Sequence, residues 1–153
     1  MEARGVWKAG FETRLEDGRG HGVTIDLPSD EGGTDVGTSG LELAVMSLAG
    51  CINTIFALVA AKRKLPFGGL TVSLTADRPA GAPTIQKVRG TLTVQTSASK
   101  EEVQTVLRLT LKTCPVGVLF EQANIPVEVT LQITPPSAAK LHLAPKHLAP
   151  EPT

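Results

Sequence analysis

Apolar and polar residues alternate along two stretches near the N-terminus, residues 7–11 and 23–27. A period of two is typical of half-buried β-strands, and the sequence Glu16-Asp17-Gly18 between the two stretches is typical of a turn. We therefore predict an N-terminal β-hairpin. Pro28 ends the second strand, and a loop rich in Gly, Asp and Ser follows up to residue 40.

A long apolar segment comes next and predicts a helix from about Gly40 to Lys64. Ser39 and Glu42 have the spacing of a capping box, and Pro66 disfavours helix just before it. Residues 43–61 carry no charge, so this helix is apolar nearly all round and must be buried on most sides. One sheet covers only one side of a helix. A symmetric partner is the simplest cover for the rest, so we expect a homodimer.

The second half of the chain adds three strands and two helices. Alternation predicts strands over 70–76, 88–94 and 127–133, while a second capping box at Ser99 and Glu102 precedes a helical repeat up to Leu111. Pro115 suits the first turn of a further short helix to about residue 123. The predicted order is β-β-α-β-β-α-α-β, an α+β domain over residues 1–134. The Pro-rich C-terminal tail, 135–153, is expected to lie outside the catalytic domain, since its composition cannot bury a core.

The charge pattern excludes several classes of protein. Fifteen basic residues balance fifteen acidic ones without a basic block, which predicts no nucleic-acid partner. Residues 43–61 are long enough to span a membrane, but polar residues interrupt them and the predicted strands need a covering helix, so no membrane span is expected. The start of the chain shows no signal-peptide pattern, and we predict a cytoplasmic protein.

Two cysteines, Cys51 and Cys114, are the candidates for chemistry. They are too few for a disulfide scaffold, and no histidine stands at metal-ligand spacing from them, so we predict neither a metal nor a cofactor. Cys51 lies inside the predicted long helix. Cys114 lies where one helix ends and another begins, a position at which exposed N–H groups stabilise a thiolate. Either cysteine could simply be a small buried packing residue. The functional alternative is that the two act as an attacking and a resolving thiol that lie within disulfide range.

Three charged residues are candidates for a catalytic role but also have a purely structural interpretation: Glu42, Arg14 and Arg19. The capping box accounts for Glu42 by itself. Nine residues at about 100° each put Glu42 and Cys51 on opposite faces of a straight helix, so a catalytic link requires a break at Gly50 or a Glu42 from another subunit. The two arginines belong to the predicted hairpin and suit solvated surface charges.

The sequences around both cysteines resemble those of the OsmC/Ohr family. The first is Ser39-Gly-Leu-Glu-Leu-Ala-Val-Met-Ser-Leu-Ala-Gly-Cys51, and the second is Thr113-Cys-Pro-Val-Gly-Val-Leu-Phe120. The similarity spans roughly residues 7–133 and is nearest to a less characterised branch, with Gly117 where a serine is common. The resemblance implies an intertwined homodimer whose long central helices are enclosed by two antiparallel sheets.

The same resemblance implies thiol-dependent reduction of organic hydroperoxides. Cys51 is then the peroxidatic residue and Cys114 the resolving one, and a small dithiol or a redox protein restores both thiols. The family's glutamate corresponds best to Glu42, one residue nearer the cysteine than in better-studied members, and its arginine to Arg14 or Arg19. A positive side chain is also required physically, because the effect of a helix dipole fades within the first turn.

Two other functions fit the same residues. The first is a binding protein that keeps the dimeric fold and holds a small hydrophobic ligand near Cys51 without peroxide turnover. The second is general thiol–disulfide exchange, which the absence of a Cys-x-x-Cys motif disfavours.

Overall fold

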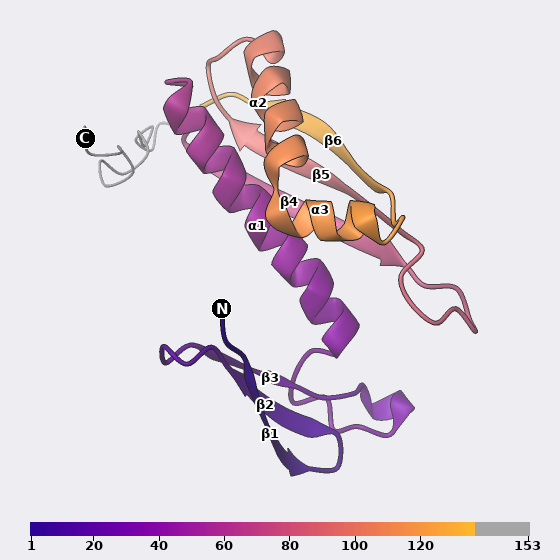
Figure 1. Ribbon diagram of the computed structural model, residues 1–153. Helices are drawn as coiled ribbons and strands as arrows, with labels where there is room; N and C mark the ends of the chain where they lie inside the picture. Colours follow the sequence, from indigo (N-terminus) through magenta and orange to yellow (C-terminus); the bar gives the residue numbers. More distant parts are fainter. Residues whose placement is uncertain (137–153) are drawn as a thin grey trace. The chain divides into compact units, whose positions relative to one another are not determined.

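The computed structural model describes residues 1–136; the rest of the predicted C-terminal tail, 137–153, lies outside the described residues. The elements, shown in Figure 1, are β1 (Arg4–Ala9), β2 (Glu12–Glu16), β3 (Gly22–Ile25), the 3-10 helix η1 (Ser29–Glu31), α1 (Gly40–Lys62), β4 (Gly69–Asp77), β5 (Lys87–Gln95), α2 (Lys100–Thr113), α3 (Pro115–Gln122) and β6 (Val127–Thr134). The chain divides into two units, residues 1–46 and the residues from Ser47 onward.

The N-terminal unit contains a three-stranded antiparallel sheet in the order β1-β2-β3. The prediction of a two-stranded hairpin therefore missed one strand. An additional tight turn at Gly10, with φ 51°, separates β1 from β2. Within residues 1–46, all of which the structure describes, only Asp26 is buried. Trp7 and Phe11 are 68% and 55% exposed. This sheet has no apolar core of its own.

The second unit contains a sheet in the order β4-β5-β6 with α1, α2 and α3 on one face (Figure 1). β4 and β5 are antiparallel, but β6 is parallel to β5, with Leu92 paired with Leu131. The expectation of two wholly antiparallel sheets is therefore wrong for this sheet. α2 and α3 carry the chain back along the sheet before β6 begins, and a crossover connection of this kind produces a parallel pair.

The core of the second unit lies between this sheet and the helices. α1 contributes a stripe with a spacing of four residues, and β5 and α2 contribute the facing side chains. The fully buried residues are Leu48, Ile52, Phe56, Ala60, Val88, Leu92, Val94, Val103, Val106, Thr110 and Cys114. Cys114 is thus placed in the core by the same packing that holds α2 on the sheet.

α1 is one uninterrupted helix, and Gly50 is helical. The alternative of a break at Gly50 is therefore wrong; Gly50 costs helix stability relative to alanine but does not end the i→i−4 hydrogen-bond ladder. By length and composition α1 could cross a membrane, a criterion that the core helix of a soluble protein also meets. Only the stripe from Leu48 to Ala60 is buried, although the helix is apolar on its other faces as well.

Candidate functional site

Cys114 links α2 to α3 and caps both helices. Its backbone N–H donates to the Thr110 carbonyl oxygen at 2.8 Å, and its Sγ accepts from the backbone N–H of Gly117 at 3.4 Å. The following Pro115 explains the extended backbone of Cys114, with φ −67° and ψ 112°, because the residue before a proline is disfavoured in the helical region. Pro115 itself occupies the first turn of α3, where no N–H is needed.

The side chains of the two cysteines are neighbours in the fold. Both cysteines are free; Cys51 is half-buried on α1, and Cys114 is fully buried. Burial raises the pKa of the Cys114 thiol to about 11, and the neighbouring Cys51 side chain acts in the same direction. The fold thus brings together two thiols that are 63 residues apart in the sequence.

Glu42 forms the predicted capping box at the start of α1. The Ser39 N–H donates to Glu42 Oε2 at 2.7 Å, and the Glu42 N–H donates to Ser39 Oγ at 3.3 Å. The Thr38 hydroxyl donates to the same carboxylate at 3.2 Å. The hydrogen bonds from Ser39, followed by that from Thr38, lower the pKa of Glu42. Glu42 is therefore an ionised capping residue, and a catalytic role for it stays a prediction.

The two predicted arginines differ in their surroundings. Arg19 lies in the turn between β2 and β3 and forms an exposed ion pair with Asp17 at 2.8 Å. Arg14 lies on β2, is half-buried, and forms no ion pair with any residue that the structure describes. Both belong to the N-terminal unit, so their role toward a thiol stays a prediction. Arg14 is the better candidate because its charge is not already paired.

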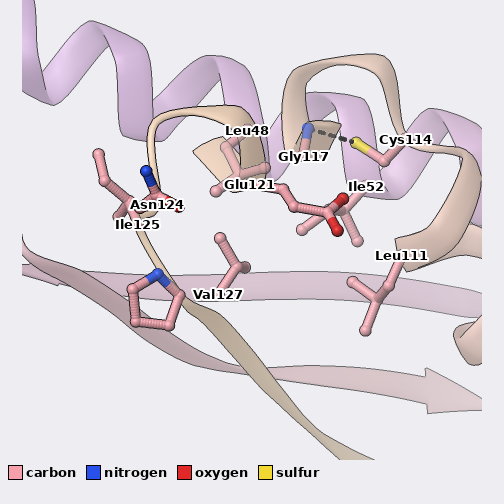
Figure 2. A pocket seen from close by; sticks show the side chains of 10 residues that line it. Leu48, Ile52, Leu111, Cys114, Gly117, Glu121, Asn124, Ile125 and Val127 are labelled. Carbon is pink, nitrogen blue, oxygen red and sulfur yellow. Dashed lines mark hydrogen bonds between the residues drawn. The ribbon is translucent and has the colours of Figure 1, made fainter. Parts of the chain in front are cut away.

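A cavity of about 400 Å³ opens beside Cys114 in the second unit. Its wall includes Leu48 and Ile52 of α1, Leu111 of α2, Glu121 of α3 and Val127 of β6, and Figure 2 shows the Glu121 carboxylate among these apolar side chains. Cys51 is not part of this wall.

The sequence analysis missed Glu121 and the cavity. The signal for Glu121 was present, because Cys114, Gly117 and Glu121 are spaced by three and four residues and share one face of α3. The cavity itself requires that α1, α3 and β6 converge, and no local pattern encodes that convergence. The described residues contain no group of three or more His, Cys, Asp or Glu side chains able to hold a metal ion.

The fold and the two neighbouring cysteines define a small α+β protein with two free thiols. The family model of OsmC-like proteins matches residues 32–130, which is well over half of the chain. The protein therefore belongs to the OsmC-like family. None of the functionally curated proteins matches this sequence.

Solved structures of the same fold carry different descriptions. An OsmC-like protein from Mycoplasma pneumoniae is 16% identical with a TM-score of 0.78, and the match covers 87% of this chain and 96% of that one. An organic hydroperoxide resistance protein from Elizabethkingia anophelis is 19% identical with a TM-score of 0.69, over 86% and 94% of the two chains. The organic hydroperoxide resistance protein OsmC from Legionella pneumophila is 16% identical with a TM-score of 0.66, and the match covers 86% of this chain and 95% of that one. At these identities the likeness establishes the fold.

Proposed function

We propose that this protein is a cysteine-based peroxidase that reduces organic hydroperoxides to alcohols. The observation that carries the proposal is the proximity of Cys51 to Cys114, since the fold brings a half-buried thiol near a buried one across 63 residues of sequence. A pair of this kind matches the requirements for an attacking and a resolving thiol. Proteins of the same fold that are described as organic hydroperoxide resistance proteins support this choice of substrate.

The reaction begins at Cys51. Its thiolate attacks one oxygen of the hydroperoxide, the O–O bond breaks, and the alkoxide takes a proton and leaves as the alcohol. Cys51 is oxidised to a sulfenic acid. The Cys114 thiolate then attacks the Cys51 sulfur, hydroxide leaves and is protonated to water, and the Cys51–Cys114 disulfide forms. A dithiol or a redox protein restores both thiols by exchange.

The two thiols need different activation. Cys51 lies in the interior of α1, more than two turns beyond its first residue, where the helix dipole contributes little. A cation is needed there, and Arg14, delivered by its own chain or by a second copy, is our choice. The Cys114 thiolate has a local hydrogen-bond donor instead. The Gly117 N–H already donates to Sγ, and this hydrogen bond becomes stronger when the thiolate forms.

We also propose that the working form is a homodimer. The N-terminal sheet buries no apolar residue, and α1 buries only one stripe within the chain. A second copy of the chain supplies cover for both of these surfaces at once, because a symmetric interface pairs them reciprocally. It also offers a Glu42 that does not share a helix with the Cys51 in question.

A stopped-flow assay tests the peroxidase directly. Reduced protein is mixed with one equivalent of cumene hydroperoxide, and free thiols are counted by alkylation and mass spectrometry. We expect the loss of two thiols per chain and a Cys51–Cys114 cross-linked peptide. Two free thiols after exposure would overturn the proposal. Saturable binding of apolar ligands without thiol loss would instead support the hydrophobic ligand-binding function.

A further inference from the structure

The loop between β3 and α1 is built around a buried carboxylate that the peroxide reaction does not use. Asp26 is 3% exposed and is the one buried residue of the N-terminal unit, all of which the structure describes. Its Oδ2 accepts from the Thr34 N–H at 2.9 Å, the Thr34 hydroxyl at 2.7 Å and the Val36 N–H at 3.4 Å. The bond from the Thr34 hydroxyl lowers the pKa of Asp26 to about 2, so the carboxylate is ionised at neutral pH. A buried charge needs such donors, and Asp26 therefore fixes the conformation of this loop.

The end of the same loop lies directly against β3. A side chain on Gly37 would overlap the Thr24 carbonyl oxygen, so glycine is required for this close approach. The Asp26 N–H donates to the Thr38 carbonyl oxygen at 3.1 Å, and Ile25 and Thr38 form a parallel bridge. The residues just before α1 thus extend the N-terminal sheet beyond β3.

This extension of the sheet connects two of the candidate catalytic charges. Arg14 of β2 pairs with Thr24 of β3, two residues before Asp26. At the other end of the loop, the Thr38 hydroxyl donates to the Glu42 carboxylate at 3.2 Å. A continuous path of hydrogen bonds therefore runs from the strand of Arg14 through β3 to Glu42, and Asp26 lies within it.

We propose that Asp26 is a positioning residue for the cysteine chemistry. Its carboxylate fixes the loop before α1 and so holds Arg14 and Glu42 in one set arrangement within the N-terminal unit. Asp26 acts through Arg14 and touches no reacting atom. This role rests on the proposed function in that Arg14 is taken as the cation that acts on Cys51.

Loss of the Asp26 carboxylate should loosen this arrangement. Thr34 and Val36 are exposed, so water can replace Asp26 as the acceptor for their N–H groups, and the loop then gains conformations that the carboxylate excludes. The attraction between a cation and a thiolate falls with their separation, so it depends on how well the cation is held in place. A loosened loop therefore weakens the effect of Arg14 on its thiol.

Alkylation of Cys51 tests this role without any peroxide. Reduced protein is treated with iodoacetamide at neutral pH, and mass spectrometry gives the rate of alkylation at Cys51. Because a nearby cation favours the reactive thiolate, we expect Arg14→Ala to slow this rate about tenfold or more and Asp26→Ala to slow it about three- to tenfold. The matched control, Asp30→Ala, removes an exposed carboxylate of the same loop and should stay within about twofold of the wild-type rate.

A double variant distinguishes positioning from a general loss of structure. In the Arg14→Ala protein, the further change Asp26→Ala should slow alkylation of Cys51 no more, because the cation through which Asp26 acts is already gone. An equal slowing in both backgrounds would overturn the proposal. So would a wild-type rate in either single variant.

Two milder variants decide the matter even where Asp26→Ala fails to fold. All three donors bond to one oxygen of Asp26, so Asp26→Asn keeps an acceptor there and should alkylate within about twofold of the wild-type rate. Thr34→Val removes only the hydroxyl donor and should slow alkylation roughly two- to fivefold, but not in the Arg14→Ala background. A wild-type rate for Thr34→Val would overturn the proposal. Failure of the peroxide assay leaves these rates valid, so the proposed function and the role of Asp26 can fail separately.

Discussion

At the residue scale, Cys114 has two structural positions at once, as the C-cap of α2 and the N-cap of α3. Its sulfur accepts from the Gly117 N–H, yet the side chain is fully buried. The first feature stabilises the thiolate and the second stabilises the thiol. Burial is the larger effect, so Cys114 is a protonated, poorly reactive thiol at neutral pH. These properties fit a resolving thiol, which should react only after the other cysteine has been oxidised.

Substituting each cysteine should give opposite results. Cys51→Ser should abolish peroxide reduction, because no nucleophile for the peroxide remains. Cys114→Ser should allow one reduction and then accumulate Cys51 as sulfenic or over-oxidised acid. Mass spectrometry after one equivalent of cumene hydroperoxide distinguishes the two. A Cys114→Ser protein that turns over at the wild-type rate would show that resolution does not use Cys114.

The rate of disulfide formation should increase with pH. The resolving step requires the Cys114 thiolate, and burial raises the pKa of Cys114 to about 11, so the thiolate is a minor form below that pH. Oxidation of Cys51 changes its effect on the pKa of Cys114, but burial, which is the largest cause of the raised pKa, remains. We therefore expect about a tenfold increase per pH unit between about pH 7 and 9.

Quenched-flow alkylation of the single-turnover reaction measures this rate, with Cys114→Ser as the control that lacks the step. A rate of disulfide formation that does not depend on pH over this range would contradict the assignment of a raised pKa to Cys114.

At the element scale, α2 is the helix that carries Cys114 into the core, and its start is fixed by a full capping box. The Glu102 N–H donates to Ser99 Oγ at 3.3 Å, and the Ser99 N–H donates to Glu102 Oε2 at 2.9 Å. Ser99→Ala should lower the free energy of unfolding by about 0.5–2 kcal/mol, because one N–H at the helix start loses its acceptor. Urea unfolding followed by circular dichroism measures the change.

The matched control is Ser97→Ala, an exposed serine two residues earlier that lies outside the helix. Its free energy of unfolding should stay within about 0.5 kcal/mol of the wild-type value. If the two variants lose equal stability, the capping box does not account for the start of α2.

The elements that the sequence predicted are those with a strong local signal. α1 and α2 have capping boxes and end near a proline or a change of period, and the structure places both within a few residues of the prediction. β2 was missed because Glu12–Glu16 has one apolar residue among charged and polar ones, in a sheet that buries no apolar side chain. The parallel direction of β6 was missed because strand direction depends on the crossover and not on the strand's own residues.

The site divides in the same way. Both cysteines and the capping role of Glu42 follow from local spacing, so they were accessible from the sequence. The cavity and Glu121 depend on the convergence of α1, α3 and β6, which are far apart along the chain. Long-range convergence is set by packing of the whole second unit, and periodicity within one element carries no information about it.

At the scale of the whole molecule, one chain leaves more apolar residues of α1 and the N-terminal sheet outside the core than it buries. α1 is apolar on all faces, but only its residues Leu48, Ile52, Phe56 and Ala60 are buried. Met46, Trp7 and Phe11 are each more than half exposed. Exposed apolar surface of this extent is typical of an interaction surface in a soluble protein. We take a second copy of the chain as the cover.

A charge placed on the uncovered side of α1 should therefore separate the subunits. Ile55 is half-buried within the chain and lies next to the buried stripe, not in it. Ile55→Lys should convert the dimer to a monomer or to unfolded protein, because a lysine at the centre of an apolar interface must be desolvated without a partner. Ile55→Val keeps the apolar character and should remain dimeric.

Light scattering at micromolar concentration measures the mass, and circular dichroism separates a folded monomer from an unfolded chain. A wild-type protein that is a stable folded monomer, or an Ile55→Lys protein that stays dimeric, would contradict the placement of α1 in the interface. The result also bears on the predicted role of Glu42, because Glu42 and Cys51 lie on one uninterrupted helix, and a catalytic link between them would require a Glu42 from a partner subunit.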